Sequence, residues 1–157
     1  MKNSTIVFFV IFFFSLSFKG HSQDFKTVKS WPDGLYSYSI PSEWSSDTSN
    51  SYVGSHGEKV LEDIVLDAAL NKDYCDNLKL FGNNKGVSAE TKKMIQIGTV
   101  QACSWAYTFD AGAGDVFKRH SLYFMSKGML QKLTVTFPVK AADDVVMNRI
   151  IDSVVIR

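Results

Sequence analysis

Residues 121–138, SLYFMSKGMLQKLTVTFP, constrain the fold more strongly than any other stretch of this sequence. After the SKG turn apolar residues alternate with polar ones, and this two-residue period is typical of half-buried strands. Leu133, Val135 and Phe137 are expected to point inward, with Lys132, Thr134 and Thr136 outward. Every feature of this hairpin has a packing reason, so we interpret it as scaffold.

Two extended runs precede the hairpin, at 92–97 and 99–110, with Gly98 at a turn or bulge between them. In the second run, alternate residues place one large side chain after another on a single face: Cys103, Trp105, Tyr107 and Phe109. The opposite face carries small residues that would let another layer approach closely: Ala102, Ser104, Ala106 and Thr108. With residues 116–125 running back, the pattern predicts an antiparallel three-stranded meander.

After Pro138 the sequence predicts a helix that begins at Asp143 or Asp144. Its buried residues would be Val146, Met147, Ile150 and Ile151. The final VVI either belongs to this helix or returns to extended structure. An α+β fold follows, with an antiparallel sheet flanked by helices.

The first half of the chain is less regular. A Pro-Asp-Gly turn precedes a strand at 35–40, in which Tyr36, Tyr38 and Ile40 share one face. The next residues form a polar loop with room for a short strand at 52–53. Ser55 and Glu58 make a capping box, which predicts a helix at 57–71, although DIVLDAAL within it also suits a strand. On that helix four acids would form either a solvated face or a patch for a basic partner: Glu58, Glu62, Asp63 and Asp67.

Residues 1–22 have the features of a signal peptide. Lys2 precedes an apolar run of about 13 residues, and Gly20 and Ser22 are the small residues expected before cleavage at Gln23. The run is shorter than the roughly 20 residues that span a bilayer, so a retained anchor is the less favoured alternative. The sequence thus predicts export to the periplasm or the outside of the cell, with residues 23–157 as one mature domain and no stable membrane anchor.

Cleavage changes the charge balance, because it removes two lysines and no acid. The 17 basic residues become 15, against 16 acidic ones. A mature chain near −1 argues against a nucleic-acid partner, which requires a basic face. Cys75 and Cys103 both survive cleavage, and they form either a disulfide, which an oxidising compartment permits, or buried free thiols.

Several of these segments resemble the PsbP-like and DcrB-like exported proteins. The similarity lies in IPSEW, where a strand ends at Pro41 before Trp44, and in LTVTFP followed by a terminal helix that ends near Ser153. It covers the first strand and about the last 65 residues, but not 46–92. The resemblance implies an α/β/α sandwich and a function by binding, as in photosystem assembly, envelope maintenance, secretion chaperones and immunity proteins. It implies no shared catalytic residues.

Only two histidines remain after cleavage, His56 in a loop and His120 in a strand. Each is most simply a solvated or hydrogen-bonded side chain, and the alternative is a small hydrolase that uses one of them with nearby acids. A Gly-x-Ser-x-Gly elbow is absent from the sequence. No catalytic residue and no cofactor is therefore predicted.

The remaining candidate binding residues border loops. Trp31, Trp44 and Tyr52 are of the kind that anchor interfaces, although Trp44 also suits a core plug at a strand end. Asp110 and Asp115 flank the flexible hairpin tip DAGAGD and could ligate Ca²⁺ weakly with backbone carbonyls. The sequence favours an exported, non-catalytic envelope protein that binds another protein. The alternatives are the hydrolase and a small-ligand or Ca²⁺-binding protein.

Overall fold

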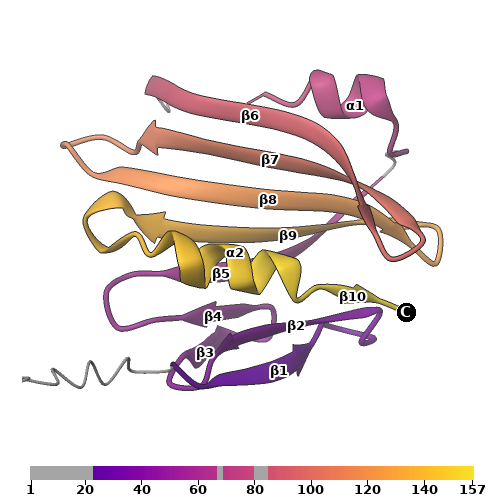
Figure 1. Cartoon of the computed structure of the whole chain (residues 1–157), viewed down its shortest axis with the longest axis horizontal. Helices are drawn as coiled ribbons and strands as arrows, with labels where there is room; N and C mark the ends of the chain where they lie inside the picture. Colours follow the sequence, from indigo (N-terminus) through magenta and orange to yellow (C-terminus); the bar gives the residue numbers. More distant parts are fainter. Residues whose placement is uncertain (1–22, 67–68, 80–84) are drawn as a thin grey trace, which may run out of the picture.

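The computed structural model describes residues 23–66, 69–79 and 85–157. Its two antiparallel sheets have the strand orders β3-β4-β5-β9-β8-β7-β6 and β1-β2-β10. Figure 1 shows helix α2 crossing the front of the larger sheet, with the smaller sheet below it. The signal-peptide prediction for 1–22 lies outside the described residues.

The smaller sheet consists of β1 (Phe25–Lys29), β2 (Tyr36–Pro41) and β10 (Val155–Ile156). The larger sheet consists of β3 (Ser45–Thr48), β4 (Ser51–Val53), β5 (Lys59–Val65), β6 (Lys85–Ile97), β7 (Val100–Asp110), β8 (Val116–Ser126) and β9 (Met129–Pro138). The helical segments are α1 (Lys72–Asp76), a 3-10 turn η1 (Val139–Ala141) and α2 (Asp144–Asp152). No described helix has the length and apolar character needed to cross a membrane.

The C-terminal half follows its sequence pattern. Strands β7, β8 and β9 form the expected meander, with Ser126 opposite Met129 at the SKG turn. Lys127 has a φ of 46° and Gly128 one of 78°, so this turn uses the left-handed backbone that glycine adopts at least cost. Helix α2 is capped by the Asp143 side chain and buries the four expected residues, and the chain end returns to extended structure in β10.

The two faces of the larger sheet differ in what covers them. The inner face, defined by Leu133, Val135 and Phe137, packs against β2 and α2 in one hydrophobic cluster. Ala102 and Ser104 of β7 are buried on this side, as the prediction of small residues beneath a second layer requires. The two sheets and α2 thus share one core.

The outer face, defined by Trp105, Tyr107 and Phe109, carries a second cluster that includes α1. Cys75 of α1 and Cys103 of β7 form a disulfide, with their Cα atoms 5.6 Å apart. This resolves the choice between a disulfide and two free thiols in favour of the disulfide. It ties the five-residue helix α1 to β7, the strand next to the edge strand β6.

The expected α+β fold, a sheet flanked by helices in an α/β/α sandwich, is wrong, because the described residues are mostly β and their two antiparallel sheets pack on each other. The expected helix at 57–71 is wrong as well: β5 occupies 59–65 and pairs with β9 along its whole length. The burial of this segment has the two-residue period of a strand, since Val60 and Glu62 are buried while Leu61 and Asp63 are only partly covered. Glu58 and Glu62 are therefore buried acids rather than members of a solvated helical face, and Asp67 lies outside the described residues.

The N-terminal lead-in also differs from expectation. Residues 25–29, for which no strand was predicted, form β1 and pair with β2 from Phe25↔Pro41 to Lys29↔Ser37.

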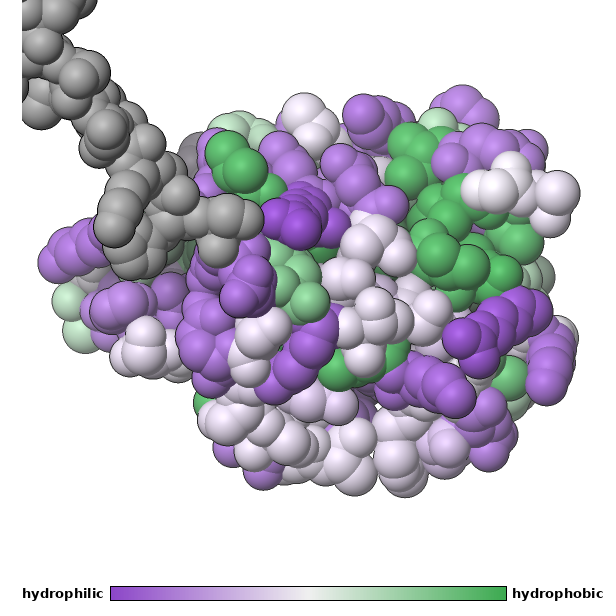
Figure 2. Space-filling model, turned by 60° about the horizontal axis from the view of Figure 1, so that its bottom comes forward, coloured by the Kyte–Doolittle hydropathy of each residue, from purple (hydrophilic) through white to green (hydrophobic). Residues whose placement is uncertain are grey.

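At the other end of the molecule, Figure 2 shows a cluster of hydrophobic residues on the right, where Figure 1 places β10 and the β6–β7 hairpin. The core reaches the surface there through partly buried hydrophobic residues of these elements: Ile95, Ile97, Val100 and Ile156.

Candidate functional site

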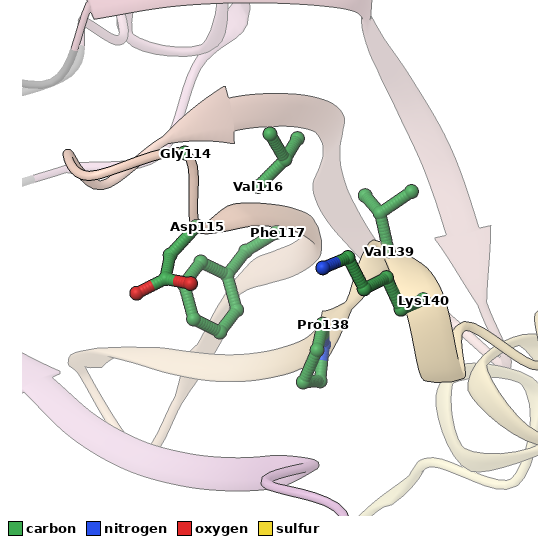
Figure 3. Close-up of a pocket in the computed structure, with 7 residues that line it drawn as sticks. All are labelled: Gly114, Asp115, Val116, Phe117, Pro138, Val139 and Lys140. Atoms are coloured by element: carbon green, nitrogen blue, oxygen red, sulfur yellow. The ribbon is translucent and has the colours of Figure 1, made fainter.

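The surface of the molecule is hollowed on both sides of Phe117, the second residue of β8. One hollow, of about 200 Å³, is shown in Figure 3 and is formed by the β7–β8 hairpin and the segment after β9. Its lining consists of Gly114, Asp115, Val116, Phe117, Pro138, Val139 and Lys140. Val116 and Val139 are exposed, so this hollow is open and largely apolar.

The second hollow lies on the outer face across β5, β9 and β8, has a volume of about 220 Å³, and is called the basic groove below. It is lined by Gly57, Lys59, Leu61, Phe117, Arg119, Lys132, Thr134 and Thr136. The strand register explains this set, because Lys59, Thr136 and Arg119 are directly opposite one another on neighbouring strands. Side chains in such a row are neighbours on one face of a sheet.

Arg119 is the cation of the basic groove that the neighbouring side chains hold by an aromatic contact and two hydrogen bonds. Its guanidinium lies over the Phe109 ring, with 4.5 Å between Cζ and the ring centroid. Nε donates to Thr136 Oγ1 at 3.0 Å, and Nη1 donates a longer bond of 3.4 Å to the Tyr107 hydroxyl. The aromatic contact and the two bonds fix the plane of the guanidinium while leaving part of it facing the groove.

A third hollow, of about 220 Å³, lies on the other side of the β4–β5 turn, and we call it the acidic pocket. Its lining is Gln23, Glu43, Trp44, Ser55, His56, Glu58, Phe137, Ala141, Asp143 and Val146. Glu58 is buried and accepts from the His56 backbone N–H at 2.8 Å, with His56 Nδ1 at 3.3 Å from its other oxygen. A Cβ on Gly54 would lie 2.5 Å from the Glu58 carboxylate and 2.8 Å from Trp44 Nε1, so this turn leaves no space for a side chain.

Trp44 and His56, two of the residues singled out from the sequence, are thus brought together. Trp44 is buried and packs on Phe137, with ring centroids 5.8 Å apart, so the core-plug interpretation is confirmed. His56 is exposed on the turn, and its imidazole is close to the Glu58 carboxylate rather than to a second histidine.

The other histidine, His120, lies on the inner face. Its Nε2 is 2.8 Å from the Ser104 hydroxyl. Burial lowers the pKa of His120 from 6.5 to about 4; Asp152 opposes the shift, and Lys93 and Lys118 add to it. Ser104 is only 4% exposed and His120 is partly buried, so the hydroxyl of this pair is covered by its neighbours.

The two acids of the hairpin tip, Asp110 and Asp115, have different contacts. Asp110 accepts from the Gly112 backbone N–H at 2.7 Å and so closes the turn, and Asp115 is part of the apolar hollow. Within 23–66, 69–79 and 85–157 no group of three or more histidines, cysteines or acids could hold a metal ion.

Trp31 and Tyr52 lie apart from the hollows. Trp31 is 50% exposed in the β1–β2 turn, and its backbone N–H donates to Glu62 Oε2 at 2.6 Å. Tyr52 of β4 is half-buried against the inner core. Sequence reasoning identified neither Arg119 nor Lys59 as a site residue, and it assigned Lys132, Thr134 and Thr136 only as outward-facing strand positions.

A signal for the basic groove was present in those outward positions. Lys132, Thr134 and Thr136 form one polar row on β9, and Arg119 lies on the outward parity of β8. The sequence did not predict that β5 lies next to β9, because residues 57–71 were predicted to form a helix.

No protein-family model matches this chain, and no curated protein matches it. Among solved structures, it is similar to a crystal structure from Bacteroides thetaiotaomicron VPI-5482, with 16% sequence identity and a TM-score of 0.52. The match covers 84% of this chain and 48% of the other, so this chain spans about half the length of that protein. At this identity the similarity concerns the fold alone.

Proposed function

We propose that this chain is an exported protein that binds another protein without catalysis, and that the basic groove is its binding surface. The observation that carries the proposal is Arg119, held on an aromatic floor in a hollow between two lysines and two threonines. Arginine and aromatic residues dominate binding hot spots, where a fixed polar group lies beside apolar surface. Leu61 and Phe117 supply that apolar surface.

The chemistry of His120 supports a non-catalytic function. A general base is most effective when its pKa is near the working pH, whereas burial lowers the pKa of His120 to about 4. Its partner Ser104 is buried beneath the inner layer. We therefore interpret this pair as a packing contact in the core.

Export is the second part of the proposal. The disulfide between Cys75 and Cys103 supports it, because such bonds persist in oxidising compartments. We expect the protein recovered from the periplasm or medium to begin at Gln23. Intact-mass measurement tests this directly, and a mature protein that retains residues 1–22 would contradict it.

Co-purification tests the binding surface. The tagged chain 23–157 is incubated with envelope and medium fractions of its own organism, and co-purifying proteins are identified by mass spectrometry. Thr136→Trp fills the basic groove, and Thr27→Trp makes the same change at an exposed position of β1. We expect one protein to be captured by the wild type and Thr27→Trp, and to be lost with Thr136→Trp. Equal capture by both variants, or none by the wild type, would contradict the proposal.

A further inference from the structure

The charge of the basic groove differs in sign from that of the mature chain. The groove is lined by Lys59, Arg119 and Lys132 and by no acidic residue. The mature chain as a whole has one more acid than base, because cleavage leaves 15 basic and 16 acidic residues. A local concentration of positive charge on a slightly acidic protein favours an anionic ligand at that place.

The three cations are not equally available to such a ligand. Lys59 Nζ lies 3.0 Å from Asp47 Oδ2, and Lys132 Nζ lies 3.4 Å from Asp63 Oδ2. Within the described residues, Arg119 has no carboxylate partner, and its bonds go to the hydroxyls of Thr136 and Tyr107. Those two bonds use two of the five guanidinium N–H groups. Arg119 is therefore the cation whose charge is not already neutralised.

The surroundings of Arg119 suit a planar anion. The Phe109 ring on one face and the hydroxyl contacts at its edge hold the guanidinium in place before a ligand arrives. A fixed, partly buried guanidinium binds a carboxylate through two parallel hydrogen bonds, and less free energy is spent on ordering the side chain. The groove volume of about 220 Å³ has room for one side chain rather than a large ligand.

We infer that Arg119 receives the side-chain carboxylate of an Asp or Glu residue on the partner polypeptide. Leu61 and Phe117 take an apolar neighbour of that residue, and the hydroxyls of Thr134 and Thr136 lie beside the ion pair. This inference rests on the proposed function, since it assigns the chemistry of the partner at the same groove.

Side-chain NMR of the folded chain 23–157 tests the inference, with the Arg119 Nε–H signal as the readout. The probes are two blocked pentapeptides, Ac-Thr-Val-Glu-Val-Thr-NH₂ and the same peptide with Gln in place of Glu, each titrated to about 10 mM so that millimolar dissociation constants can be measured. We expect the Glu peptide to shift this signal and the Gln peptide to leave it unchanged. Sodium acetate and a phosphoserine peptide are titrated in parallel.

Two variants separate the ion pair from general charge attraction. Arg119→Lys keeps the charge but loses the planar fork, and we expect it to weaken binding of the Glu peptide about tenfold or more, measured from the backbone amide signals of Thr134 and Thr136, which this variant retains. Arg149→Lys is the matched control, because Arg149 of α2 also stacks on a phenylalanine, Phe25, at 3.9 Å but is outside the groove. It should leave the affinity unchanged, and circular dichroism verifies that both variants are folded.

The outcomes separate the two proposals. Equal response to the Glu and Gln peptides, or no response to either, would overturn the carboxylate inference, and loss of partner capture with Thr136→Trp would still support the groove as a protein-binding surface. A stronger response to acetate or to the phosphoserine peptide than to the Glu peptide would also overturn it. Failure of capture by the wild-type protein would instead count against the proposed function.

Discussion

Glu62 and His120 are ionisable side chains on the inner face of the larger sheet, and their environments affect stability in different ways. Glu62 is 4% exposed. It accepts from the Tyr38 hydroxyl at 2.5 Å and from the Trp31 backbone N–H at 2.6 Å. Burial raises the pKa of Glu62, and the two donors oppose that shift. The carboxylate thus connects the β1–β2 turn to the large sheet.

Removal of the Glu62 carboxylate should therefore be costly. Glu62→Ala leaves two donors without their acceptor, and a buried unsatisfied group costs about 1–3 kcal/mol, so we expect a loss of about 2–4 kcal/mol in the free energy of unfolding. Asp63→Ala, the next residue on the strand, removes only a partly exposed ion pair with Lys132, and should cost less than about 1 kcal/mol. Urea denaturation of both variants measures the difference, and equal losses would contradict this role for Glu62.

His120 predicts a pH dependence of stability. Its folded pKa is lowered to about 4 from 6.5, so between these values the unfolded chain binds a proton that the folded chain does not. Stability is therefore fully present above pH 6.5 and is lost as the pH falls towards 4, by at most about 3 kcal/mol. His120→Gln should lose less stability than the wild type over this range. Denaturation curves at pH 7 and pH 4.5 measure the loss in the free energy of unfolding for each protein. Equal losses for the wild type and His120→Gln would contradict the assignment of this pH dependence to His120.

Helix α1 is held in place mainly by its N-cap and by the disulfide. It has five residues, and only Cys75 among them is fully buried. An isolated helix of this length is not stable in water. Its N-cap Asn71 accepts from the Tyr74 N–H at 2.7 Å, and the disulfide to β7 supplies the long-range connection.

Reduction of the disulfide should release this helix selectively. The bond closes a loop with a sequence separation of 28 residues, for which chain entropy gives about 3–4 kcal/mol of stabilisation. We expect Cys75→Ser with Cys103→Ser to lower the free energy of unfolding by about that amount, and amide hydrogen exchange of α1 to become fast. Exchange in α2, which is packed in the other cluster, is the internal control. Unchanged protection of α1 in the double variant would contradict this role of the disulfide.

Strand β5 explains where sequence-based reasoning failed. The capping box at Ser55 and Glu58 and the apolar spacing of 61–68 predicted a helix, but Glu58 instead accepts bonds from His56 within a turn. Tertiary pairing outweighed this local signal for a helix, because every residue of β5 has a partner on β9. The meander, by contrast, was predictable, since β7, β8 and β9 are adjacent in sequence and β9 alternates between apolar and polar residues.

At the scale of the whole molecule, the two faces of the large sheet have different roles. The inner face carries the main core shared with β2 and α2. The outer face is covered by α1 over the β7 side, while the β5–β9–β8 side carries the basic groove. The sequence predicted which side chains of β9 point outward, but the groove itself depends on β5 lying next to β9, and a non-local pairing of this kind has no short-range signal.

Site-specific photo-crosslinking in living cells tests whether the basic groove binds a protein. A photoreactive phenylalanine derivative replaces Thr136 in the groove or Thr27 on β1 of the full chain, expressed in its own organism. We predict that the Thr136 position crosslinks to one protein, that Thr27 does not, and that Arg119→Met abolishes the product. Crosslinks of equal strength from both positions, or none from Thr136 in a protein that is exported and folded, would contradict the claim that the basic groove binds a protein.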